Sequence, residues 1–397
     1  MASRRTLRTA AVGMSVIPTC GVRAHAGVLA DALRAEDVSC ELHWLSRRED
    51  SFGAARADVR AWTRRLAAEL AAEELDAILL HYSVFAYSYR GIPLFVHPTL
   101  SVLRRARVPV ITVMHELVYP WNIGGARGKL WAASQRAMLI DVMRASSAAL
   151  ATAEFRVQWL ESRPWLPARA TAFAPVFSNL PAPAARPRPA RSGALVGLFG
   201  YAYEGASGSL VLDALRRLRD RGVDLQLRLL GAPGRSSPAA EAWLAAAGSS
   251  GVADALSFSG TLSPDELSDA LAECDILLFI GAGGPSSRKG TLAGSLASGR
   301  PVVALDGPRR WSELLEADAL RVVAPTAQGL ADGLAELVAD EQAREALGAR
   351  GRAFAEQQMG AARTAVAVRA LLDALADDHD DDRRPQRSDD LATVDRG

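Results

Sequence analysis

Lysine is nearly absent from this chain of 397 residues, in which Lys129 and Lys289 are the only two. Arginine supplies the other fixed cations, and the formal net charge is +1. No excess of positive charge therefore points to nucleic acid as a partner. Because arginine is used at almost every cationic position of this chain, the lysine retained at position 289 is a candidate site residue.

Cysteine is also scarce, with three residues that are far apart in the chain: Cys20, Cys40 and Cys274. Their odd number and wide spacing give neither a disulfide framework nor a zinc-binding pattern. A reducing compartment is the default for such a chain, so we expect the cytoplasm.

Long apolar runs are missing, because none reaches the roughly 18 residues that a membrane span needs. The N-terminus begins with basic residues and resembles an export signal, but Ser15 and Pro18 interrupt its short apolar part. We expect Thr9–Ile17 to be the first buried strand instead.

What the chain does contain is a regular alternation of apolar runs and amphipathic stretches, which predicts α/β architecture. With 49% hydrophobic residues, a chain of this length suits two domains. A proline-rich stretch with polyproline II character begins near Thr171 and indicates the boundary. We place the first domain at residues 1–177, the linker at 178–192 and the second domain at 193–360. The charged tail, residues 376–397, is expected to be disordered.

The segment Cys274–Ala304 reads as strand, glycine-rich loop, helix and strand. Small residues and two cations lie in the loop just before a helix that is expected to begin near Thr291. Free backbone N–H groups and the helix dipole make such a place suited to a phosphate group. Glycines that serve only a tight strand–helix connection are the alternative. The anion-binding residues would be Ser286, Ser287, Arg288, Lys289, Gly290 and Thr291.

Two further strand ends carry histidine, where open α/β sheets bind ligands. One is followed by His81 and a tyrosine-rich loop, whose rings and hydroxyls suit a sugar or cyclitol acceptor; a packed loop with aromatic anchors is the alternative. The other is followed by His115 and Glu116, for which a buried histidine satisfied by the backbone is the alternative. The candidate tyrosines are Tyr82, Tyr87 and Tyr89.

The run ASGRPVVA, preceded by LSFSGTLSPDELSDALAECDILL, resembles the donor-site half of GT-B glycosyltransferases, in particular the retaining GT4-like group. The resemblance implies two Rossmann-like, doubly wound domains that face each other across a cleft, with a returning helix at 361–375 on the first domain. It also implies transfer of a sugar from a nucleotide-diphosphate sugar, with no cofactor and no obligatory metal.

The resemblance implies further site residues. His115 matches the family histidine beside the reacting carbon of the donor, and Glu116 is a candidate base or acceptor anchor. Leu262 matches a residue whose backbone touches the nucleobase. Gly21 belongs to a loop over the cleft, near the donor phosphates. His25 either faces the cleft, near the acceptor, or simply starts the helix that follows. Gly200 and Tyr201 follow the first strand of the second domain.

The sequence departs from the family pattern at two acidic positions, where Ser286 and Gly294 stand in place of glutamates. The arginine and lysine that often clamp the donor diphosphate are missing after Phe199, and Arg288 with Lys289 could replace them. Two alternatives follow: a transferase-like protein that binds without catalysis, and a sugar-nucleotide epimerase on the same fold.

The expected partners are a nucleotide sugar donor and a sugar, cyclitol or lipid-linked acceptor, with no nucleic acid and with a possible peripheral membrane contact. The composition fits a GC-rich bacterial genome and a role in natural-product or cell-envelope glycosylation.

Overall fold

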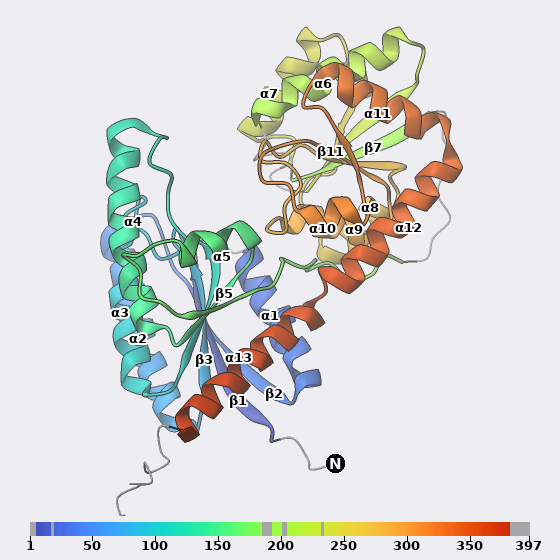
Figure 1. Ribbon diagram of the computed structural model, residues 1–397. Coiled ribbons are helices and arrows are strands. Elements are labelled where there is room, and N and C mark those ends of the chain that lie inside the picture. Colours follow the sequence, from blue (N-terminus) through green and yellow to red (C-terminus); the bar gives the residue numbers. More distant parts are fainter. Residues whose placement is uncertain (1–4, 17–19, 185–192, 201–204, 232–233, 382–397) are drawn as a thin grey trace, which may run out of the picture.

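The first domain is built on a six-stranded parallel sheet in the order β2-β1-β3-β4-β5-β6 (Figure 1). The computed structural model describes residues 5–16, 20–184, 193–200, 205–231 and 234–381. The strands of the first sheet are β1 (Leu7–Ser15), β2 (Val38–Ser46), β3 (Ala77–Ser83), β4 (Val110–Glu116), β5 (Ala148–Ala151) and β6 (Ala170–Phe173).

Helices cover both faces of this sheet, with α2, α3 and α4 on one side and α1 on the other (Figure 1). The helix Phe52–Ala72 is amphipathic, because Val59, Trp62, Leu66 and Leu70 share one face and are all buried. The helices are α1 (Gly21–Leu33), α2 (Phe52–Ala72), α3 (Val96–Ala106), α4 (Gly125–Ala145) and α5 (Glu154–Glu161), with a 3-10 turn at Arg34–Glu36.

The second domain repeats the design around a sheet in the order β12-β11-β10-β7-β8-β9. Its strands are β7 (Ala194–Phe199), β8 (Leu225–Leu230), β9 (Leu256–Phe258), β10 (Ile276–Phe279), β11 (Val302–Leu305) and β12 (Arg321–Val323). Its helices are α6 (Gly205–Asp220), α7 (Pro238–Ser249), α8 (Pro264–Ala272), α9 (Gly290–Ala297), α10 (Ser312–Glu316), α11 (Ala327–Ala339) and α12 (Glu341–Gln358). The fold is α/β, with two sheets of parallel strands.

The last helix, α13 (Ala361–Asp381), returns to the first domain and packs beside α1 (Figure 1). Ala365, Val368 and Leu372 join a core cluster of that domain. The Arg369 guanidinium donates to the carbonyl of Glu36 over 2.9 Å. Because α13 continues to Asp381, the expectation of disorder from residue 376 is wrong for residues 376–381. The rest of the tail lies outside the described residues.

Three short elements are absent from the sequence prediction: α5, β6 and β12. The stretch after Pro18, expected to be a loop, is helical from Gly21 onward. Of the expected linker, residues 178–184 contain neither helix nor strand, and residues 185–192 lie outside the described part.

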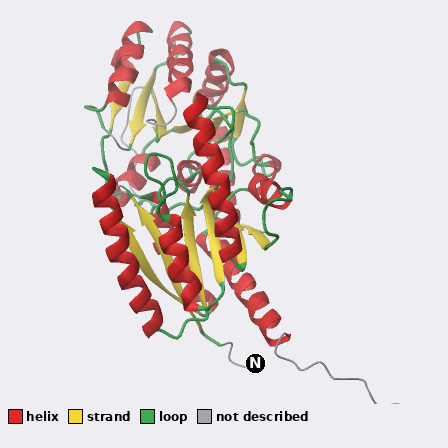
Figure 2. Ribbon diagram, turned by 90° about the vertical axis from the view of Figure 1, so that its left-hand side faces the viewer, coloured by secondary structure: helices red, strands yellow, loops and turns green. Residues whose placement is uncertain are grey.

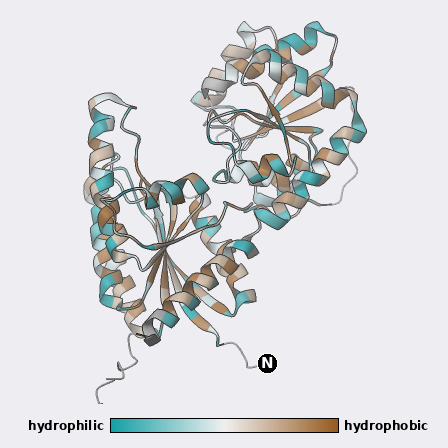
Figure 3. Cartoon of the chain, viewed as in Figure 1, coloured by the Kyte–Doolittle hydropathy of each residue, from teal (hydrophilic) through white to brown (hydrophobic). Residues whose placement is uncertain are grey.

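Apolar residues concentrate in the strands and on the inner faces of the helices, while outward helix faces are hydrophilic (Figure 3). Seen after a 90° turn, the strands of the first sheet lie side by side behind helices (Figure 2). Among the described residues, no helix combines the length and the apolar character needed to cross a membrane.

Candidate functional site

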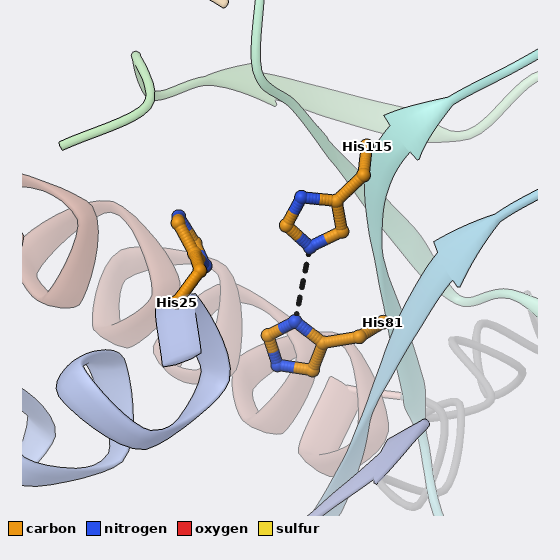
Figure 4. Close-up of side chains that lie close together, drawn as sticks. All are labelled: His25, His81 and His115. Atoms are coloured by element: carbon orange, nitrogen blue, oxygen red, sulfur yellow. Dashed lines mark hydrogen bonds between the residues drawn. The ribbon is translucent and has the colours of Figure 1, made fainter. Parts of the chain in front are cut away.

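Three histidines from three elements meet in the first domain: His25 of α1, His81 of β3 and His115 of β4 (Figure 4). His81 Nδ1 and His115 Nε2 are 3.1 Å apart and share a hydrogen bond. The ring centroids of His25 and His115 are 4.9 Å apart, nearly perpendicular. On its other face His25 stacks on Phe177, at 4.1 Å and 18°. Because β3 and β4 are parallel neighbours, their carboxyl ends bring two of the imidazoles together.

Burial keeps these imidazoles neutral at pH 7. Desolvation lowers the pKa of His81 to about 4. Desolvation, with repulsion from His81, lowers the pKa of His25 to about 3. The pKa of His115 also lies well below its ordinary value, because of burial and the neighbouring histidines. A cluster of neutral rings can donate or accept hydrogen bonds, but it supplies no positive charge.

The hydrogen bond between His81 and His115 can exist in two tautomeric arrangements. If His115 donated from Nε2, His81 would carry its proton on Nε2, which is buried and has no hydrogen-bond partner among the described residues. Buried N–H groups without an acceptor are rarer than unused lone pairs. We therefore assign the proton to His81 Nδ1, which leaves His115 with an N–H at Nδ1. That nitrogen points away from His81 (Figure 4).

The spacing of the three imidazoles also bears on metal binding. One nitrogen from each ring lies within 4.8 Å of the others, so small rotations would let them share an ion. In the structure, however, the nitrogens of His81 and His115 face each other along a hydrogen bond. We treat the cluster as a hydrogen-bonding unit.

Arg156, at the start of α5, is a site residue that the sequence analysis missed. Its guanidinium donates to the carbonyl oxygens of Met114 and His115 and to Thr152 Oγ1. Burial lowers the pKa of Arg156 to about 10, and repulsion from Arg288 and Arg309 adds to this effect. Arg156 follows the carboxyl end of β5, so the strand-end argument used for His81 would have found it.

Arginines from both domains therefore converge near Arg156. The guanidinium of Arg309 lies over the ring of Phe155, 5.5 Å from its centre. The N–H of Arg309 donates to the carbonyl of Gly283, which ties its loop to the glycine-rich loop. Glu116 balances part of this charge: it attracts Arg156 and accepts a 2.8 Å hydrogen bond from Ser83.

The expected phosphate site is a pocket of about 200 Å³ in the second domain, lined by the ends of β7 and β10, the glycine-rich loop and the start of α9. Arg288 and Lys289 both line it, and α9 begins at Gly290 with Lys289 at its N-cap. A Cβ on Gly200 would lie 2.8 Å from Thr291 Cγ2. The structure thus brings together Gly200, Arg288, Lys289, Gly290 and Thr291.

The remaining donor-site candidates lie elsewhere. Ser286 and Ser287 are buried, and the carbonyl of Ser287 accepts from the Val176 N–H, between the domains. The carbonyl of Gly21 accepts from Asn179, in the linker. Leu262 lines a different pocket, of about 440 Å³, beside α8. Tyr201 lies outside the described residues.

The acceptor-site tyrosines are split. Tyr82 and Tyr87 belong to the hydrophobic core of the first domain, with 0% and 1% of their surface exposed. Burial raises the pKa of both phenols, and neither hydroxyl has a partner among the described residues. Both are core residues rather than acceptor contacts, which corrects the sequence expectation. Tyr89 is half-buried beside Phe52 and remains a candidate.

Comparison with known proteins bears on this arrangement. Residues 194–340 match the model of the family described as Glycosyl transferases group 1. No curated protein matches the sequence.

Solved structures match nearly the whole chain at low identity. Sucrose-phosphate synthase from Thermosynechococcus elongatus has a TM-score of 0.67 at 13% identity, over 94% of this chain and 100% of its own. The structure of Anabaena Alr3699/HepE in complex with UDP and glucose matches with a TM-score of 0.65 and 14% sequence identity. The match covers 93% of this chain and 100% of that one. A putative UDP-N-acetylglucosamine 2-epimerase from Listeria monocytogenes matches with a TM-score of 0.58 and 12% sequence identity. The match covers 98% of this chain and 100% of that one.

These likenesses define the architecture as the GT-B fold. Within the second domain, residues 194–340 are similar to the group 1 glycosyl transferases.

Proposed function

We propose that this protein transfers a sugar from a nucleotide-diphosphate sugar to a small-molecule or lipid-linked acceptor, with retention of anomeric configuration and without a metal ion. The observation that carries the proposal is the pocket where Arg288 and Lys289 meet the start of α9. Cations and helix N–H groups together suit a diphosphate. Glycosylation of bacterial natural products or of the cell envelope is the pathway that we favour.

The reaction breaks the bond between the anomeric carbon and the diphosphate oxygen. Negative charge then grows on the diphosphate, and Arg288, Lys289 and the backbone of α9 would stabilise it. An acceptor hydroxyl forms the new bond to the anomeric carbon, and its proton passes to a base, for which Glu116 is our candidate.

His115 would orient the donor sugar. With its proton on Nδ1, this imidazole offers a hydrogen bond to a sugar oxygen without carrying charge. Arg156 fixes the backbone carbonyl of the same residue. The acceptor would approach from the first domain, near Tyr89. His25 and His81 are 2% and 1% exposed, so the expectation that they contact the acceptor is wrong, as it is for Tyr82 and Tyr87.

One observation favours the non-catalytic alternative. A Cβ at Gly294, where the resemblance places an acidic residue, would contact Leu180 and Phe199 at 3.4 Å. The packed surroundings leave little room for a glutamate side chain there. Without that carboxylate, the ribose of the donor would need another partner.

Turnover assays test the proposal and separate it from its rivals. Nucleotide sugars with UDP, GDP, ADP and dTDP are incubated with a panel of sugar, cyclitol and polyprenyl acceptors, and NMR follows the anomeric proton. Product that requires acceptor and keeps the anomeric configuration is the expected result. Conversion of the donor alone to an epimer would identify an epimerase, and binding without any turnover would favour the non-catalytic reading.

A lipid-linked acceptor would place the first domain against a membrane. Trp121, Ile123 and Leu130 are 49%, 52% and 59% exposed, in the loop before α4 and in its first turns. Arg127 and Lys129 lie between them in sequence. Apolar and basic side chains together suit an anionic lipid surface.

Vesicle sedimentation checks this contact. The protein should bind anionic vesicles, and Trp121→Ser with Ile123→Ser should weaken binding several-fold. Val366→Ser, at an exposed valine of α13, is the control. Equal binding by the double variant would contradict the membrane contact.

A further inference from the structure

A second group of titratable side chains lies at the outer edge of the first sheet. Glu41 and His43 are two residues apart on the edge strand β2, so their side chains share one face of the sheet. Glu69 lies in the last turn of α2, and Glu73 follows the helix directly as its C-cap. We call these four residues the β2–α2 cluster.

The imidazole of His43 is held in a defined orientation within this cluster. Its side chain is 5% exposed, and Nδ1 lies 2.9 Å from Glu69 Oε2. A hydrogen bond to a carboxylate places the proton of a neutral imidazole on that nitrogen, so the lone pair is on Nε2. Histidines that bind metal ions are oriented in this way, by a carboxylate on the opposite ring nitrogen.

The free nitrogen points into a group of oxygens. Nε2 of His43 is buried without a hydrogen-bond partner among the described residues, and its nearest carboxylate oxygen, Glu73 Oε1, is 3.8 Å away. One ligand atom from each of Glu41, His43 and Glu73 lies within 4.8 Å of the others. A lone pair facing carboxylates is unfavourable unless a proton or a cation lies between them.

The surrounding charge favours a cation. Apart from the contacts with His43, no ion pair involves Glu41, Glu69 or Glu73 in the described part of the chain. Among the described residues, therefore, no ion pair with arginine or lysine offsets the charge of these three carboxylates.

We propose that the β2–α2 cluster binds a divalent first-row transition metal ion, with Zn²⁺ as its representative. His43 Nε2 and one oxygen each from Glu41 and Glu73 would be the ligands, and Glu69 would be the carboxylate that orients His43. Nitrogen and carboxylate ligands of this kind suit zinc, at about 2.0–2.2 Å from the ion. Glu41 is exposed and Glu73 is half-buried, so their side chains can rotate inward to close the site.

The consequence would be structural. The ion would join the edge strand β2 to α2, two elements that otherwise meet through apolar packing such as that of Leu45 on the helix. It would also offset the repulsion among the three carboxylates.

Calorimetric titration of the intact, chelator-treated protein with Zn²⁺ at pH 7 tests the proposal. We expect saturable binding that His43→Gln abolishes and that Glu73→Gln weakens more than 10-fold. Glu69→Gln should weaken it by about 10- to 100-fold, as removal of an orienting carboxylate does. Glu74→Gln, next to the cluster but outside it, is the matched control and should bind as the wild type does.

Zn²⁺ added in a titration could also reach the cluster of His25, His81 and His115, whose ring nitrogens lie within 4.8 Å of one another, so His115→Gln is titrated in parallel. Binding that survives in His43→Gln and disappears in His115→Gln would contradict the proposal, as would the absence of saturable binding in the wild type. In that case His43 would serve only as a structural contact between β2 and the end of α2. Thermal melting in EDTA checks that each variant folds. If His43→Gln does not fold, Glu41→Gln, at an exposed position, replaces it as the variant that should lose zinc binding.

Discussion

His81 determines what His115 can offer to a ligand. His81 has 1% of its surface exposed, so it acts from behind, through the 3.1 Å hydrogen bond to His115 Nε2. A single buried hydrogen bond is worth about 0.5–1.5 kcal/mol, and 1.4 kcal/mol corresponds to a factor of ten.

Replacing His81 by Gln should therefore lower turnover by up to about 10-fold, because the ring of His115 loses its fixed tautomer. Steady-state kinetics measure the effect, with melting temperature as a check of folding. His97→Gln, at a histidine whose side chain is 60% exposed, is the control. If both variants turned over as fast as the wild type, His81 would have no role in orienting His115.

At the scale of residues, the sequence singled out His81 and His115 because each lies at the carboxyl end of a strand, and Arg288 and Lys289 because they precede a helix. It did not identify the contact between the two histidines, since a hydrogen bond across 34 residues depends on the pairing of β3 and β4. The prediction that Tyr82 and Tyr87 contact an acceptor was wrong because aromatic rings near the end of a strand can pack in a hydrophobic core as well as against a ligand.

At the scale of elements, the end of β7 and the start of α9 meet at the phosphate pocket, which Gly200 and Thr291 both line. Gly200 has φ of +80°, in the region that favours glycine, and faces Thr291 of α9. A residue with a Cβ at position 200 would be strained at this φ, and its Cβ would also lie too close to Thr291.

Gly200→Ala should lower the free energy of unfolding by about 1–2 kcal/mol. It should also weaken nucleotide binding, because Thr291 must move. Gly248→Ala in α7 is the matched control, since its Cβ meets no atom within 4 Å. Urea denaturation of both variants gives the comparison. A loss in Gly248→Ala as large as that in Gly200→Ala would show that the effect is not specific to this junction.

The longer helices show the apolar periodicity that makes an element predictable from sequence, and α8 begins with a capping box formed by Ser263 and Glu266. The missed strands β6 and β12 have four and three residues, at sheet edges, too short for an alternating pattern. Arg156 was missed because the strand-end argument was not applied to β5.

At the scale of the whole molecule, the neutral histidines couple the stability of the first domain to pH. Each of these histidines has a pKa in the folded protein below the ordinary value of 6.5. As the pH falls, the unfolded chain therefore binds a proton at this side chain before the folded protein does. The stabilisation is complete above pH 6.5 and is lost as the pH falls towards the folded pKa values of about 4 for His81 and about 3 for His25.

Between pH 6.5 and 4, each such histidine should lower the free energy of unfolding by about 1.4 kcal/mol per pH unit. His25→Phe keeps a ring to stack on Phe177 and removes one titrating group, so its profile should be flatter. Urea denaturation at several pH values measures this, with His97→Gln as the control. Wild-type and His25→Phe profiles of the same slope would contradict the assignment of a buried, neutral His25.

The central claim is that the pocket at the start of α9 binds the diphosphate of the donor. The most direct measurement is calorimetric titration with UDP, GDP, ADP and dTDP. We predict that one of them binds, that Lys289→Ala and Arg288→Ala each weaken it by about 10- to 100-fold, as expected for charged hydrogen bonds, and that Lys129→Ala, at the chain's other lysine, has no effect. Binding by Lys289→Ala and Arg288→Ala as tight as that of the wild type would contradict the account.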